Sequence, residues 1–107
     1  MQQLFAVTLN RGPAWQKGRR LEDQVEWEAH ASFMDALEEE GFVLLGGPLE
    51  EVSEVLLIIR AQSPEEIKQR LAPDPWHEMG LLGVARITPW TLRLGSLPEP
   101  DRIDGRI

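Results

Sequence analysis

VSEVLLIIR, residues 52–60, predicts a β-strand that has no polar face. From Val55 to Ile59 every side chain is apolar. Alternate side chains of a strand point to opposite faces, so both faces of this part of the sheet must be covered. A second apolar strand is predicted at residues 42–46, joined to the first as a hairpin across Gly47 to Glu50.

A helix is predicted over residues 22–40, with Asp23 and Glu26 as a capping box and Gly41 as its end. At 100° per residue, five apolar side chains fall within an arc of about 120°. They are Val25, Ala29, Phe33, Ala36 and Leu37. Trp27, His30 and Met34 lie at one shoulder of this arc. We therefore expect the shoulder to face something beyond the core.

Three further elements complete the chain. The motif SPEE at residues 63–66 combines an N-capping Ser, a Pro at the first helical position and a Glu three residues after the cap, which predicts a helix to about Leu71. Alternating apolar residues predict strands at residues 4–9 and 81–94, the second interrupted at Pro89. The order is βαββαβ.

This order is typical of a ferredoxin-like α+β fold, in which a four-stranded antiparallel sheet carries both helices on one face. We assign residues 1–94 to this domain and residues 95–107 to an extended tail. The second face of the sheet would be an exposed apolar patch in a monomer. We therefore expect a homodimer in which two copies pack sheet against sheet.

Composition excludes several functions. The chain has no Cys, so thiol catalysis, disulfides and thiolate metal sites are ruled out. A net charge of −7 argues against nucleic-acid binding. With two His residues and no nucleotide-binding glycine motif, we predict no metal and no cofactor. No segment approaches membrane-spanning length, so we expect no membrane association and a soluble, cytoplasmic protein.

His30 and Asp74 are the candidate catalytic residues, because a carboxylate that orients an imidazole makes a general acid/base. In the plainer alternative, His30 sits at the helix shoulder and Asp74 bonds the backbone of its own turn. The tryptophans either line a pocket or fill the core, and we take Trp76, beside Asp74, as a candidate substrate-binding residue. His77 is expected at the surface.

The segment from residue 10 to residue 20 is locally basic in an acidic protein. It carries Arg11, Lys17, Arg19 and Arg20. If it folds over the site, Arg11, Arg19 and Arg20 would hold an anionic ligand such as a carboxylate, because a guanidinium matches a carboxylate with two hydrogen bonds. Otherwise the segment is a solvated loop that balances the acidic surface.

An ordered set of short motifs resembles the YCII-related family over about residues 3–93. The motifs are AHASF (29–33), EG (40–41), GGPL (46–49), SPEE (63–66), DPW (74–76), GL (80–81) and RITPW (86–90). The resemblance implies a dimeric α+β barrel with a site in each subunit and a His–Asp pair at His30 and Asp74. The wider superfamily includes muconolactone isomerase-like enzymes and a dehydrochlorinase that acts on a chlorinated hydroxymuconate.

The resemblance thus implies a cofactor-free lyase or isomerase that acts on a small anionic organic molecule. The alternative is a non-catalytic ligand-binding or accessory module that uses the same cavity, because one fold supports several functions. A purely structural dimerisation domain is the third reading.

Overall fold

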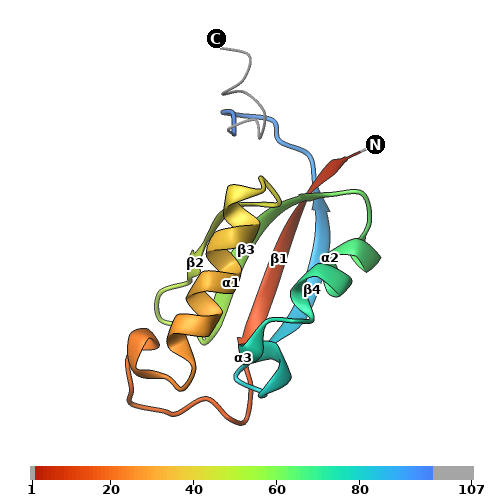
Figure 1. Cartoon of the computed structure of the whole chain (residues 1–107). Helices are drawn as coiled ribbons and strands as arrows, with labels where there is room; N and C mark the ends of the chain where they lie inside the picture. Colours follow the sequence, from red (N-terminus) through yellow and green to blue (C-terminus); the bar gives the residue numbers. More distant parts are fainter. Residues whose placement is uncertain (1, 98–107) are drawn as a thin grey trace.

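A computed structural model of the chain describes residues 2–97 (Figure 1). Its elements are β1 (Gln3–Arg11), the 3-10 turn η1 (Leu21–Asp23), α1 (Trp27–Glu39), β2 (Val43–Pro48), β3 (Glu54–Ala61), α2 (Pro64–Leu71), α3 (Pro75–Glu78) and β4 (Leu82–Trp90). The predicted ferredoxin-like α+β order is confirmed, with η1 and α3 added. Most of the predicted tail, residues 98–107, lies outside the described residues.

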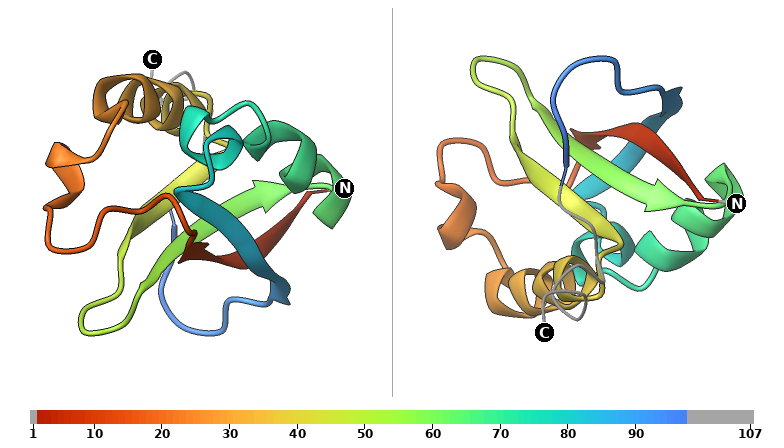
Figure 2. Two further views of the ribbon diagram at one scale, coloured as in Figure 1. Left: turned by 90° about the horizontal axis from the view of Figure 1, so that it is seen from below. Right: turned by 90° about the horizontal axis from the view of Figure 1, so that it is seen from above.

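The four strands form one antiparallel sheet in the order β2-β3-β1-β4. The helices lie on one side of this sheet (Figure 2). Pro89 does not interrupt β4, as the sequence had suggested, because it pairs in register with Phe5 and the strand continues to Trp90. An edge strand tolerates Pro because one side of it makes no ladder hydrogen bonds.

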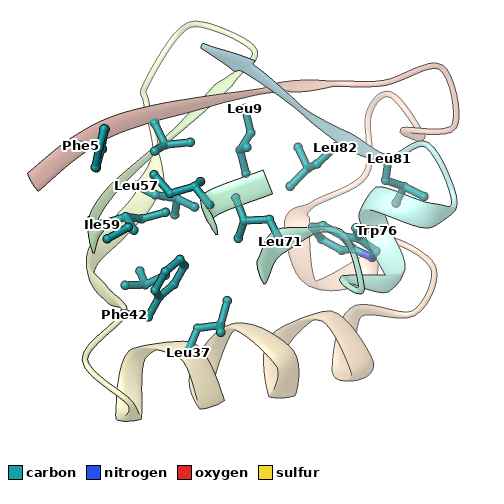
Figure 3. Close-up of a cluster of buried hydrophobic side chains, with 14 of the residues drawn as sticks. Phe5, Leu9, Leu37, Phe42, Leu57, Ile59, Leu71, Trp76, Leu81 and Leu82 are labelled. Carbon is teal, nitrogen blue, oxygen red and sulfur yellow. The ribbon is translucent and has the colours of Figure 1, made fainter. Parts of the chain in front are cut away.

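The core lies between the helices and the sheet (Figure 3). Phe5, Val7 and Ile59 of the central strands are at most 1% exposed. Above them lie Ile67 of α2 and Leu37 of α1, which are also buried. Alternation along β1 and β3 therefore places one apolar set under the helices, as the pattern predicted.

The other side of the sheet carries no helix, and we call it the open face. Strand register places apolar side chains there on all four strands, Leu4, Ala6, Leu45, Leu56, Ile58 and Trp90, together with the polar residues Thr8, Arg60, Arg86 and Thr88. Leu45 is 52% exposed and Trp90 is 40% exposed, whereas Ile58 is only 6% exposed. The open face is thus a mixed surface with exposed apolar side chains.

The helix predicted over residues 22–40 begins later, at Trp27, and the predicted capping box is wrong. Glu26 stands at the N-cap position in the left-handed region, with φ of 59°, and its side chain makes no capping bond. The cause is tertiary: the Val25 carbonyl accepts a hydrogen bond from Trp76 Nε1 at 2.6 Å. This bond holds the chain in a non-helical conformation just before α1.

The α1 face that packs inward also differs from the predicted arc. Val25 lies outside the helix and is 43% exposed, and Ala29 and Ala36 are exposed as well. The inward face consists of Phe33 and Leu37 of the predicted arc together with the predicted shoulder, Trp27, His30 and Met34. The helix is therefore turned toward its shoulder, so that Ala29 and Ala36 of the predicted arc face outward.

The start of α2 is confirmed in detail. Ser63 Oγ accepts a hydrogen bond from the Glu66 backbone N–H at 3.2 Å, and Pro64 occupies the first turn. The hairpin is also confirmed, but β2 continues to Pro48, so the connection spans residues 49–53. None of the helices in the described part of the chain has both the length and the apolarity that a membrane crossing requires.

Candidate functional site

His30 and Asp74 contact each other, although 44 residues separate them. His30 Nδ1 lies 2.9 Å from Asp74 Oδ1 and 3.0 Å from Oδ2. Only 11% of the His30 side chain and 7% of the Asp74 side chain are exposed. The contact joins α1 to the start of α3, so the pair exists only in the folded chain.

Asp74 is held by its own turn as well as by His30. It is the N-cap residue of α3, and its Oδ1 accepts a hydrogen bond from the Trp76 backbone N–H at 3.0 Å. Pro75 at the first helical position favours this turn because its φ is already helical. Asp74 therefore both contacts His30 and bonds the backbone of its own turn, the two alternatives that the sequence left open. The bond within the turn orients the carboxylate toward His30.

Trp76 holds the other side of the imidazole. The His30 and Trp76 rings are stacked, with centroids 3.8 Å apart and planes 6° from parallel. Trp76 is fully buried, and its Nε1 donates to the Val25 carbonyl. The His30 ring is thus fixed at one edge by a carboxylate and on one face by an anchored indole.

The contact with Asp74 determines which nitrogen of His30 carries the proton. An ionised carboxylate only accepts hydrogen bonds, so Nδ1 must donate, and the neutral ring then has its lone pair on Nε2. Within residues 2–97 no protein group bonds Nε2. The arrangement can therefore take a proton at Nε2 while the carboxylate stabilises the resulting imidazolium.

His30 lines a cavity of about 390 Å³ between α1 and the sheet. From α1 and the preceding turn the lining residues are Leu21, Trp27, His30, Ala31, Met34, Asp35 and Glu38. From the strands they are Leu9, Val43, Gly46, Gly47, Pro48, Val55, Leu57 and Leu82. Trp76 closes the back of the cavity behind His30. The volume is within the range of small-molecule sites.

Two cavity-lining features were missed from the sequence. The sequence predicts Gly46 at the end of a strand and Gly47 in the hairpin connection, but both lie in β2 and form part of the cavity wall. A Cβ on Gly46 would come within 2.7 Å of a Leu57 methyl group, so any larger residue there would require the Leu57 side chain to shift. Trp27 and Met34 were noted at the helix shoulder, and their spacing from His30 was the signal that could have assigned them to the site.

The three predicted anion-binding arginines do not line the cavity. The Arg11 guanidinium lies over the Trp15 ring, 4.4 Å from its centroid. Arg20 pairs with Asp23 at 3.0 Å, and Arg19 donates to the Asp23 carbonyl. Among the predicted site residues, the structure brings together His30, Asp74 and Trp76 and leaves the arginines outside.

No three His, Asp or Glu side chains converge anywhere in residues 2–97 as a metal ion would require. Fold and geometry together define a small ferredoxin-like α+β domain with a His–carboxylate pair beside a largely apolar cavity. The YCII-related domain matches residues 4–91, so the chain belongs to the YCII-related family. No curated protein matches the chain.

Proposed function

We propose that this protein is a cofactor-free lyase or isomerase that moves a proton on a small organic molecule. The observation that carries the proposal is the contact of His30 Nδ1 with both carboxylate oxygens of Asp74 beside the cavity. This contact leaves Nε2 without a protein partner among the described residues, at the nitrogen that a general base needs.

The roles follow from hydrogen-bond chemistry. His30 Nε2 accepts a proton from a carbon or oxygen of the substrate and returns it to another position or to a leaving group. Asp74 holds the ring in the Nδ1–H tautomer and stabilises the positive charge once Nε2 is protonated. The lining beside His30 is mostly apolar, and a substrate that displaces water from it would strengthen these electrostatic effects.

Proton exchange tests the proposal before a substrate is known. A panel of small carbon acids is incubated with the protein in D2O, and deuterium incorporation is followed by NMR. We expect the protein to accelerate exchange of at least one compound, and His30→Gln to remove at least about a hundredfold of that acceleration. His77→Gln is the control, because His77 is exposed and outside the cavity. Equal exchange by wild type and His30→Gln would refute the proposal.

A second candidate is a non-catalytic ligand-binding module. It is favoured by the mostly apolar lining, in which His30, Asp35 and Glu38 are the only titratable side chains. Such a module would bind a small molecule, and His30→Gln would change its affinity without any proton exchange. Binding of a compound that carries an acidic C–H, with no exchange above the solvent rate, would therefore favour this second candidate.

The open face supports the further proposal that two copies associate as a dimeric α+β barrel. Leu45 and Trp90 would be removed from water in such a dimer. Burial of apolar surface contributes about 25 cal/mol per Å², so removing the exposed parts of Leu45 and Trp90 from water would favour association. A second copy presents the same face, which suits an isologous contact.

A further inference from the structure

Trp27 differs from Trp76, the other tryptophan of the site, in the hydrogen bonding of its indole N–H. Trp76 is fully buried and its indole N–H bonds the Val25 carbonyl. Trp27 is only partly buried, it lines the cavity, and no described residue accepts a hydrogen bond from its Nε1. The indole N–H of Trp27 is therefore available to water or to a ligand.

Trp27 is also close to the proposed base. Its ring centroid lies 6.0 Å from that of His30 and 5.8 Å from that of Trp76. Both residues line the cavity, so one small molecule bound there can contact both of them. A carbonyl compound would then have a donor in the Trp27 N–H and a base in His30, since a hydrogen bond and the approach of a base to an acidic carbon each span about 3 Å.

The charges of the cavity favour an uncharged ligand. No Lys or Arg lines it, and its charged residues besides His30 are Asp35 and Glu38. Both are exposed residues of α1, and at a rise of about 1.5 Å per residue they lie about 7.5 and 12 Å along the helix axis from His30. An anionic ligand would pass two carboxylates on a protein of net charge −7.

We infer that Trp27 binds the substrate, and that the substrate is an uncharged carbonyl compound whose oxygen accepts a hydrogen bond from Trp27 Nε1. The inference rests on the proposed function for the role of His30. This substrate class differs from the anionic molecule expected from the sequence. The arginines that were expected to bind an anion lie outside the cavity.

The step needs no co-reactant. His30 Nε2 takes a proton from the carbon next to the carbonyl, and the C–H electron pair becomes the C=C bond of an enolate. The negative charge moves to the carbonyl oxygen, where the Trp27 N–H donates to it. His30 then returns the proton to the same carbon, which gives exchange, or to the γ carbon of an unsaturated substrate, which shifts the double bond.

Three matched probes test the assignment on the wild-type protein. Acetophenone carries the ring and the carbonyl, ethylbenzene lacks the oxygen, and benzoate carries a negative charge. Each is titrated while the N–H signals of the four indoles are followed by NMR. We expect acetophenone to move the Trp27 signal downfield, ethylbenzene to leave its hydrogen-bond shift unchanged, and benzoate to bind at least about fivefold more weakly than acetophenone.

Trp27→Phe keeps a ring but removes the N–H. It should weaken acetophenone binding about fivefold, the effect of one neutral hydrogen bond, and leave ethylbenzene binding within about twofold. Trp90→Phe is the matched control, since Trp90 lies on the open face and does not line the cavity. Tighter binding of benzoate than of acetophenone, no acetophenone binding up to its solubility limit, or equal acetophenone affinity in Trp27→Phe would overturn the inference.

Deuterium exchange at the acetophenone methyl group separates this inference from the proposed function. In one outcome, exchange requires His30, and both exchange and binding are unchanged in Trp27→Phe. This result would contradict the role of Trp27 and would be consistent with the proposed function. In the other outcome, acetophenone binds at Trp27, but the wild type exchanges its methyl protons no faster than His30→Gln does. This result would contradict the proposed function and support the assignment of Trp27 and of the ligand class.

Discussion

Replacing Asp74 by Ala should destabilise the fold as well as abolish any proton transfer. The substitution removes the acceptor of two buried hydrogen bonds, one from the Trp76 backbone N–H and one from His30 Nδ1. Asp74 is only 5% exposed, so water cannot replace either partner without entering the core. The substitution therefore weakens the contact between α1 and α3.

The magnitude follows from the two bonds. Loss of an N-cap costs about 1 kcal/mol, and loss of a hydrogen bond to a charged group costs about 1.5–3 kcal/mol. Together they lower the free energy of unfolding by about 2.5–4 kcal/mol, which for a domain of this size lowers Tm by about 10 °C or more. Asp74→Asn keeps an oxygen that can accept from Trp76, so it should lose only about 1 kcal/mol.

Urea unfolding followed by circular dichroism measures these differences, and a double-mutant cycle with His30→Ala isolates the pair. The two single substitutions should fail to add by about 1–2 kcal/mol, because each removes the same contact. Asp35→Ala is the control on the exposed surface of α1, and its effect should stay within about 0.5 kcal/mol.

Two results would refute this reasoning. If Asp74→Ala unfolds at the same urea concentration as Asp35→Ala, the two hydrogen bonds do not stabilise the folded state. If the Asp74 and His30 substitutions add within about 0.3 kcal/mol, the two residues do not interact in solution, and the proton-transfer site lacks its orienting carboxylate.

Ser63→Ala should lower the free energy of unfolding by about 1 kcal/mol through loss of the α2 cap, measured by urea unfolding, and no change would argue against the cap. Gly12→Ala should cost more than about 1 kcal/mol because its Cβ would meet the Gly80 carbonyl oxygen at 2.2 Å, whereas Gly47→Ala, with nothing within 4 Å, should be tolerated in the same assay. The wild type should sediment as a dimer and Leu45→Glu as a monomer, and a wild-type monomer at micromolar concentration would contradict the barrel proposal.

The strands, the hairpin and the start of α2 could be predicted from the sequence because their signals are local. The segments of β1 and β3 are short apolar runs bounded by turn residues, which is a local signal of a buried strand. The SPEE motif supplies its own cap from side chains within one turn of the helix. Family membership followed from the order of such motifs, and the match over residues 4–91 confirms it.

The start of α1, the face it buries and the shape of the site were decided by tertiary contacts. Residues before Trp27 have a helical pattern, but a hydrogen bond from Trp76, 51 residues away, holds the Val25 carbonyl outside the helix. His30 and Asp74 were chosen from the sequence by chemistry and resemblance, whereas their contact required the chain to bring α1 against α3. The arginines of the basic loop contact Trp15 and Asp23, three or four residues away along the chain, and none of them lines the cavity. Where this loop lies relative to the cavity depends on the packing of distant elements, which no local pattern encodes.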